Sequence, residues 1–367
     1  MRYLTLRALA AGLGLALLAL ASGCDSAPPA SSPVRFQGSV FGTFYQVTVN
    51  AALTQDERNA LEAGFLDELE QVDKTMSTYR DDSDLVAFNR APLGEWQTLP
   101  AALIEVMALG QQVARQSGGA FDVTVGGLVN LWSFGPEARP QEIPADDVLA
   151  ARLRQIGFEA LDVDEPARRA RRERDVFVDL SAVAKGYATD RVAAYLDAQG
   201  IEHYLVNLGG DLITRGYRNP DEHTPWRIGI EKPRASGRSA QYVIPLSGMS
   251  VATSGDYRHY FEQDGQRFSH TVDPRTGRPI THSLASVTVV DPSNARADAW
   301  ATAMTVLGAE DGMALARRLD LRVLMLVREG DGWQSLASPA FAEFIGEAFM
   351  ADHTIPVADE ATAETQG

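Results

Sequence analysis

The chain passes from a strand-like run into a helix at Val178-Asp-Leu-Ser-Ala-Val-Ala-Lys-Gly-Tyr187. We expect the helix over residues 182–199, and a second strand-like run follows at 203–208. Because a helix start offers free backbone N–H groups and Lys185 adds a positive charge, this junction could hold a phosphate or a ribose. The alternative is an ordinary strand-to-helix turn that Ser181 caps.

The segments on either side alternate irregularly between strands and helices. A helix with an apolar stripe is expected after the capping residue Thr54. The strands come in groups and no fixed-period repeat is present, so we predict an α+β fold with mixed, largely antiparallel sheets and packed helices. Further helices are expected at 100–117, 146–156 and 295–307, and strands at 40–50, 226–230, 241–245, 285–291 and 321–327.

Composition limits the class of function. The chain has 367 residues, of which 45% are hydrophobic, so it is long enough to bury a large core. Its formal net charge of −16 argues against a nucleic-acid partner. Five arginines cluster between strand-like runs at 161–164 and 175–180, and we interpret them as a solvated hairpin tip rather than a docking patch for an acidic partner. They are Arg168, Arg169, Arg171, Arg172 and Arg174.

The N-terminus has the features of an export signal: Arg2 and Arg7, an uncharged run at 8–20 and small residues before Cys24. The apolar run is too short for a comfortable membrane span. Cys24 is the only cysteine, and its setting resembles the lipobox of bacterial lipoproteins, whose cysteine receives a lipid; plain secretion is the alternative. We therefore expect a signal peptide at 1–23, a lipidated tether at 24–34, the folded domain at 35–350 and an acidic disordered tail at 351–367.

Asp298 and Thr302 lie four residues apart in the helix expected at 295–307, so a carboxylate and a hydroxyl would face one spot. Such hard oxygens suit Mg²⁺, which takes a few protein oxygens together with substrate phosphate. An acidic residue near a helix start can also simply favour the helix dipole.

Three further segments carry polar or aromatic groups. Asn207-Leu-Gly-Gly-Asp211 ends a strand with two glycines, which would let a ligand approach the backbone. His270 comes just before the turn sequence Asp273-Pro-Arg-Thr-Gly277, where the histidine could shuttle a proton or only bond into a hairpin. Aromatic and small residues around Tyr79 and Phe121 could enclose a flat heterocycle or form core.

Taken in order, these segments resemble the flavin transferases of the ApbE type, a family of bacterial lipoproteins. The resemblance covers about residues 41–308 and rests on eight motifs, which are very unlikely to occur in register by chance. The motifs are Gly42-Thr-Phe44, Met76-Ser-Thr-Tyr79, Gly119-Ala-Phe-Asp-Val-Thr124, Asp179-Leu-Ser181 with Lys185-Gly-Tyr187, Asn207-Leu-Gly-Gly-Asp211, Thr253-Ser-Gly-Asp-Tyr257, His270 with Asp273-Pro-Arg-Thr-Gly277, and Asp298-Ala-Trp-Ala-Thr302.

The resemblance implies a T-fold-like architecture and an enzyme that transfers the FMN half of FAD to a Thr or Ser hydroxyl of a target redox protein, with release of AMP. It implies Mg²⁺ held by Asp298 and Thr302, with backbone oxygen from Ala182 and Ala301. His270 and Asp298 are the implied catalytic residues; His270 would assist proton removal, with Asp256 as a competitor for that role. The residues implied to contact FAD are Phe41, Tyr79, Ala120, Phe121, Asp122, Asp179, Lys185 and Thr271.

The sequence departs from the family pattern at three positions. Phe41 stands where methionine is common, Gly127 where proline is frequent, and Lys185 where some relatives carry Glu. None of these removes a metal ligand, so activity is favoured over a degenerate binder.

Two rival functions stay open, a Mg²⁺-dependent FAD pyrophosphatase with water as acceptor and a non-catalytic flavin-binding lipoprotein. The implied partner is a periplasm-facing subunit of a membrane redox complex. Asp25, directly after the cysteine, resembles a retention signal for the cell inner membrane.

Overall fold

The computed structural model describes residues 33–358, except for 138, 235, 236, 238, 257–259, 264 and 331. The predicted signal peptide, nearly all of the predicted tether and residues 359–367 lie outside the described residues. In the part of the chain that is described, no helix has the length and apolar character needed to cross a membrane.

An eight-stranded sheet lies at the centre of the fold of residues 34–358. All neighbouring strands in this sheet are antiparallel. Strand β15 is buried at every residue, because both faces of the sheet are covered there. This confirms the predicted α+β class with largely antiparallel sheets. In sheet order the strands are β1 (Val34–Val40), β2 (Thr43–Val49), β6 (Tyr204–Leu208), β7 (Asp211–Arg215), β10 (Ser250–Gly255), β15 (Leu284–Asp291), β16 (Arg322–Glu329) and β17 (Gly332–Ala337).

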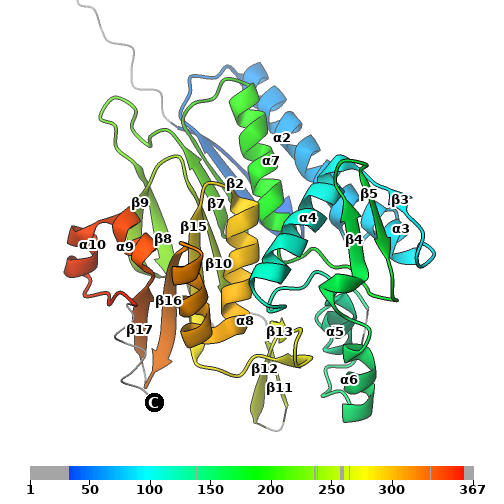
Figure 1. The fold of residues 1–367 in the computed structure, drawn as a ribbon. Coiled ribbons are helices and arrows are strands. Elements are labelled where there is room, and N and C mark those ends of the chain that lie inside the picture. The colour runs from blue at the N-terminus through cyan, green and yellow to red at the C-terminus, as the bar shows by residue number, and fades with distance from the viewer. Residues whose placement is uncertain are drawn as a thin grey trace, which may run out of the picture. The chain divides into compact units, whose positions relative to one another are not determined.

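Three helices cover one face of this sheet: α2 (Gln55–Met76), α7 (Ala184–Ala198) and α8 (Asn294–Arg318) (Figure 1). As predicted, α2 begins at Thr54, which forms a capping box with Glu57. Helix α8 continues beyond the predicted end at 307. It is interrupted at Gly308, whose φ of +82° lies outside helical geometry and explains why the pattern stops there.

The opposite face of the sheet is covered by the hairpin of β8 (Trp226–Glu231) and β9 (Ala240–Leu246) and by α9 (Pro339–Ile345) and α10 (Glu347–Asp352) (Figure 1). Alternate residues of the hairpin face inward, as the two-residue period of a half-buried strand requires. They form a second apolar cluster with sheet and helix residues, including Trp226, Ile228, Ile230, Tyr242, Ile244, Val251, Val290, Leu324 and Phe341.

A third region packs beside the helices and carries several of the motifs. Helix α4 (Ala101–Gln116) joins it to α8. Its apolar cluster brings together Leu128, Trp132, Leu149, Phe261 and Phe268. The remaining elements here are α3 (Asp84–Arg90), β3 (Gln97–Thr98), α5 (Gly126–Leu131), α6 (Asp146–Leu153), the 3₁₀ turn η1 (Phe158–Ala160), β4 (Leu161–Asp164), β5 (Arg169–Arg172), β11 (Tyr260–Gln263), β12 (Gln266–Ser269), β13 (Val272–Asp273) and β14 (Arg278–Pro279).

The structure corrects two of the strand predictions. The strand expected at 40–50 is the second half of a hairpin, because Phe41 and Gly42 have positive φ and turn β1 into β2. The run at 175–180 forms only an isolated bridge, between Phe177 and Val125.

The arginine cluster is not simply a solvated hairpin tip. Most of it forms β5, and Arg172 is buried, where it donates to the carbonyl oxygens of Val176 (2.9 Å) and Ala91 (2.7 Å). Burial lowers the pKa of Arg172. Arg172 therefore stabilises the backbone of two loops through hydrogen bonds and is not exposed to solvent.

The C-terminal boundary at 350 was placed too early. Residues 351 and 352 belong to α10, and Ile355 and Ala358 are buried. Val357 also pairs in parallel with Ala337 of β17. Apolar residues among the polar ones anchor residues 351–358 to the domain, which the acidic composition of the stretch did not indicate.

Candidate active site

A charged cluster forms where α7, α8 and the β6–β7 turn meet. The ammonium of Lys185, at the start of α7, pairs with the carboxylate of Asp211, the first residue of β7. The same ammonium lies 3.9 Å from Asp298 Oδ2, in the second turn of α8. Both carboxylates are almost completely buried, and Lys185 is about one third exposed. Three segments far apart in sequence thus place their charges at one point.

The two glycines of Asn207-Leu-Gly-Gly-Asp211 position Asp211. Gly209 and Gly210 both have positive φ, and the N–H of Gly210 donates to Asn207 Oδ1 (2.9 Å), which closes the turn. The N–H of Gly209 donates to the carbonyl of Phe44 (2.9 Å). A Cβ at Gly209 would lie 2.8 Å from a methyl group of Thr43. The two glycines were expected to let a ligand approach the backbone. In the structure the missing side chain of Gly209 lets the β1–β2 turn, which contains Phe41, pack closely against it.

Gly186 sets the distance between α7 and α8. A Cβ at Gly186 would lie 2.5 Å from the carbonyl oxygen of Asn294 and 2.8 Å from Ala295 Cα. Because this residue has no side chain, its backbone N–H reaches Asp298 Oδ2 at 3.1 Å. The N–H of a helix start therefore helps to hold the buried carboxylate, as the motif at 178–187 suggested for an anion.

Asp190, one turn further along α7, binds the start of α8. Its carboxylate accepts hydrogen bonds from the N–H of Asn294 (2.7 Å), the N–H of Ala295 (3.0 Å) and Ser293 Oγ (2.8 Å). The amide group of Asn294 donates to the carbonyls of Leu212 (2.8 Å) and Val251 (3.1 Å). These bonds fix α8 to α7, β7 and β10 next to the charged cluster.

The electrostatics of the cluster follow from its burial. Burial, together with the negative charge of Asp211, raises the pKa of Asp298 to about 7, although Lys185 and the N–H of Gly186 oppose the shift. Burial would lower the pKa of Lys185, but the carboxylates of Asp211 and Asp298 outweigh it and raise that pKa. Two carboxylates around one ammonium leave an excess negative charge.

The residues predicted to bind metal lie around this cluster. Thr302 follows Asp298 by one helical turn, and its Oγ1 lies 3.4 Å from Ser254 Oγ of β10. Ala182 precedes α7 and is partly buried. The carbonyl of Ala301 accepts a hydrogen bond from Thr305 Oγ1 (2.8 Å).

The donor set fits a hard divalent cation, because a buried carboxylate and a hydroxyl lie beside an excess negative charge. The described residues contain no group of three or more His, Cys, Asp or Glu that could hold a metal. A cation here would therefore depend on Asp298, on hydroxyl or carbonyl oxygens, and on its substrate.

A second group of predicted residues gathers around Phe134. The hydroxyl of Tyr79 lies 3.5 Å from the carbonyl oxygen of Phe134, and the Tyr79 side chain is largely exposed. The ring of His270 meets the ring of Phe134 edge-on, with centroids 6.3 Å apart. Desolvation of the hydroxyl and then the charge of Asp179 raise the pKa of Tyr79. Tyr79 and His270 therefore both lie beside Phe134.

Asp179 and Asp122 are bound within their own turns. Asp179 accepts hydrogen bonds from the N–H (2.8 Å) and hydroxyl of Ser181. Asp122 accepts from the N–H (2.8 Å) and hydroxyl (2.7 Å) of Thr124, and burial raises its pKa. The N–H of Asp179 also donates to the carbonyl of Val123 (2.8 Å), so the two motifs are adjacent.

The other predicted residues have less direct roles. Ala120 and Phe121 are almost completely buried in this structure. Thr271 uses its carbonyl to accept the N–H of Ile280 (3.0 Å). The carboxylate of Asp256 pairs with Arg328, at the end of β16.

Sequence reasoning assigned no role to three residues that build the cluster. Asp211 ends a motif that was recognised only for its glycines, so the motif itself was the available signal. Asp190 and Asn294 carry no local pattern, and only the approach of α7 to α8 reveals them.

Comparisons with known proteins identify the family and the fold of the chain. The profile of the ApbE family matches residues 41–325. The chain belongs to the ApbE family. The predicted resemblance is thus confirmed, and the family match extends beyond 308, over the rest of α8 and the first half of β16.

Relatives named FAD:protein FMN transferase match most of this chain. One from Vibrio cholerae is 42% identical over 335 residues, covering 91% of this chain and 98% of the relative. One from Klebsiella pneumoniae is 39% identical over 333 residues, covering 89% and 94%. As predicted, the protein is a transferase.

Solved ApbE structures share the fold. The flavin transferase ApbE from Vibrio cholerae has a TM-score of 0.78 at 40% identity, covering 85% of this chain and 99% of that one. The apo flavinyl transferase ApbE from Pseudomonas stutzeri has the same TM-score and identity, covering 86% and 97%. The predicted ApbE architecture is confirmed.

Proposed function

We propose that the protein transfers the FMN half of FAD to a Thr or Ser hydroxyl of a target redox protein, in a Mg²⁺-dependent reaction that releases AMP. The single observation that carries the proposal is the buried cluster of Lys185, Asp211 and Asp298 beside Thr302. Its relatives' names supply the substrate class. A site with excess negative charge and hard oxygens is suited to a divalent cation, and the bound cation would in turn attract a pyrophosphate.

The reaction requires one bond to form and one to break. The acceptor oxygen joins the phosphorus of the FMN half, and the bond from that phosphorus to the bridging oxygen breaks, so that AMP leaves with the bridging oxygen. In this proposal His270 accepts the hydroxyl proton. Bound Mg²⁺ would neutralise charge on the pyrophosphate, with Asp298 and Thr302 as its protein ligands.

The remaining residues position these groups. Gly186 and Lys185 hold Asp298 in place through a backbone N–H and an ammonium. Lys185 also orients Asp211. Tyr79, beside Phe134 and near Asp179, would cover the flavin ring from the solvent side.

We also propose that Cys24 is lipidated and that the domain faces the periplasm from the inner membrane. Arg2, Arg7 and the uncharged run before Cys24 support export. The target would then be a periplasm-facing subunit of a membrane redox complex, since a tethered enzyme reaches neighbours on the same surface.

The test incubates the full-length protein with FAD and Mg²⁺, with and without a redox subunit that offers a threonine, and follows AMP and the mass of the acceptor. The proposal predicts a gain of one FMN on the acceptor, lost in Asp298→Ala and on chelation of Mg²⁺. Asp221→Ala, at an exposed position, is the matched control and should leave transfer unchanged.

Two other outcomes would replace this function. AMP and free FMN without a labelled acceptor, for every threonine-bearing subunit tried, would indicate the pyrophosphatase. Intact FAD under all conditions, with FAD still bound, would indicate a flavin-binding lipoprotein.

A further inference from the structure

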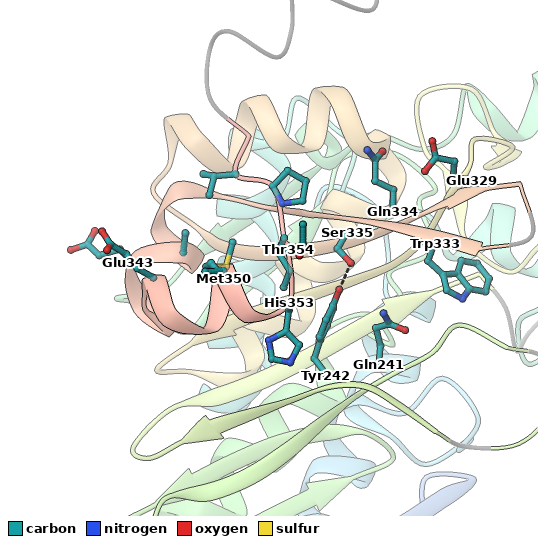
Figure 2. A pocket seen from close by; sticks show the side chains of 16 residues that line it. Gln241, Tyr242, Glu329, Trp333, Gln334, Ser335, Glu343, Met350, His353 and Thr354 are labelled. Atoms are coloured by element: carbon teal, nitrogen blue, oxygen red, sulfur yellow. Dashed lines mark hydrogen bonds between the residues drawn. The ribbon is translucent and has the colours of Figure 1, made fainter.

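A large cavity lies away from the charged cluster, between β9, β17 and the segment that follows α10 (Figure 2). Its volume is about 1200 Å³, and none of the candidate site residues predicted from sequence lines it. Tyr242 and Ser335 meet inside it through a 2.6 Å hydrogen bond between their hydroxyls, and His353 lies beside Tyr242 with ring centroids 5.2 Å apart. We call this cavity the β17 groove.

One wall of the β17 groove is an unfinished sheet edge. Strand β17 is the last strand of the eight-stranded sheet. The N–H of Ala337 donates to the carbonyl of Pro356 (3.0 Å), and the N–H of Ala358 donates to the carbonyl of Ala337 (2.9 Å). The segment after α10 therefore begins a further parallel strand, but its only bridge to β17 among the described residues is at Ala337.

The geometry of a strand shows which groups remain open. Backbone N–H and C=O groups of alternate residues point to the same side of a strand. The backbone N–H and C=O groups of Ala337 point away from β16. Those of Ser335 and Trp333 therefore do so too, because the β16–β17 register contains no bulge that would change the alternation. No described residue bonds the backbone of Ser335 or Trp333 on that side. Trp333 is partly exposed and Ser335 is buried, and an edge whose backbone groups are unbonded is a template for an added strand.

The rim of the β17 groove is acidic. Glu329, Glu343 and Glu347 are exposed and line the cavity, and none forms an ion pair with a described residue. The nearby guanidinium of Arg328 is engaged by Asp256, so it does not neutralise them. The ring of Trp333 adds an apolar surface to the lining of the cavity, on the side of Glu329 (Figure 2).

We propose that the β17 groove binds an extended segment of a partner protein that carries Lys or Arg, added as a strand to β17. The edge supplies backbone hydrogen bonds at Trp333 and Ser335, and the three glutamates select positive charge. A second copy of this chain would bring its own carboxylates to the same rim. Residues 359–367 include Asp359, Glu360 and Glu364, so they carry the same sign of charge. The proposal is independent of the flavin transfer reaction.

The test uses the full-length protein and a blocked peptide of alternating Val and Lys, about ten residues long, a length that covers an ordinary strand. Binding is measured by fluorescence anisotropy at low salt, and backbone amide exchange is followed at Trp333 and Ser335. We expect binding that slows exchange at these two amides and weakens as salt is added.

Four comparisons separate the contribution of charge from that of the sheet edge. Neutralising Glu329, Glu343 and Glu347 together to Gln should weaken binding by about tenfold or more. Neutralising Glu95, Glu142 and Glu165, which are exposed elsewhere, is the matched control and should leave binding unchanged. A peptide of alternating Val and Glu, and a Val–Lys peptide methylated on alternate amide nitrogens, should both fail to bind.

Four results would overturn the proposal. These are the absence of binding, binding without protection of Trp333 and Ser335, equal binding of the Val–Glu peptide or the methylated peptide, and protection that depends on protein concentration, which would make a second copy the occupant.

Discussion

At the scale of single residues, the site depends on a charge balance that Lys185 only partly achieves. Its ammonium faces Asp211 and Asp298, which are 2% and 4% exposed. Removing one member of a buried charged group leaves the others unpaired, and that is usually worse than removing the whole group. Charge should therefore influence folding stability here as well as activity.

We predict that Lys185→Met lowers the free energy of unfolding by roughly 2 kcal/mol, below the range for a fully buried pair because the ammonium is partly exposed. Urea denaturation at neutral pH measures the change. In the double variant Lys185→Met/Asp211→Asn part of the loss should return, since one unpaired charge has gone. A double variant as unstable as the sum of both single variants would contradict this account.

Gly186 offers a second test at this scale. We predict that Gly186→Ala destabilises the protein by about 1–3 kcal/mol, because its Cβ would meet backbone atoms of Asn294 and Ala295, which cannot move aside cheaply. Thermal unfolding measures the change. Gly229→Ala is the control, since its Cβ would meet only Ala240 Cβ at an ordinary 3.5 Å. Equal melting temperatures for the two variants would show that α7 and α8 tolerate separation.

At the residue level, sequence alone draws attention to residues whose motif is local. Asp298 and Thr302 were recognised because four residues make one helical turn, and the structure places both beside the cluster. Asp190 and Asn294 act across two helices, and Asp211 pairs with a lysine on another element. Such partners depend on tertiary packing, which periodicity in one segment does not report.

At the scale of elements, hydrogen bonds at the start of α8 fix this helix to α7, β7 and β10, and so position the site residues relative to one another. Asp190 caps it from α7, and Asp298 lies one turn further along α8. A cap supplied by another helix fixes relative position as well as ending a helix.

We predict that Asp190→Ala costs about 1–2 kcal/mol of stability and also lowers flavin transfer and the affinity for Mg²⁺, which isothermal titration calorimetry can measure without substrate. Thr54→Ala is the matched control, because it removes the cap of α2 at similar cost without touching α7 or α8. If Asp190→Ala loses stability but binds Mg²⁺ normally, Asp190 has no positioning role.

Helices with a clear period of apolar residues were predicted well. Strands that form because of the strands beside them were not. The helices expected at 100–117 and 182–199 match α4 and α7 within two residues at each end. By contrast, β5 consists of Arg169–Arg172, whose polar sequence does not suggest a strand; Trp96 packs against two of its guanidinium groups, with centroid distances of 4.6 and 4.7 Å. The part of α8 beyond Gly308 was missed because one glycine in an unusual conformation ends the visible pattern.

At the scale of the whole molecule, one sheet separates two apolar layers, the three-helix layer and the layer of the β8–β9 hairpin with α9 and α10. The charged cluster belongs to the first layer, and the β17 groove to the second. The same chain can therefore present a catalytic site and a docking surface on different faces of the sheet.

The proposed anchor is also tested at this scale. We predict that Cys24→Ser moves the protein from the membrane fraction to the soluble fraction after cell breakage, because the lipid would no longer be attached. Its transfer of FMN to a soluble acceptor fragment should be unchanged. Ser26→Ala is the control and should stay with the membrane. Retention of Cys24→Ser in the membrane fraction would argue for another mode of attachment.

The pairing of β2 with β6 has a consequence for how the chain reaches its native state. Tyr45 lies opposite Leu208, so the sheet cannot close until more than half of the chain is available. Contacts between residues so distant in sequence make folding slow, since a long loop must be ordered before the pairing stabilises it. During synthesis the β1–β2 hairpin emerges before β6, the strand with which β2 pairs. A chain that stays unfolded while it emerges is well suited to threading through a secretion pore, which the predicted export signal would require.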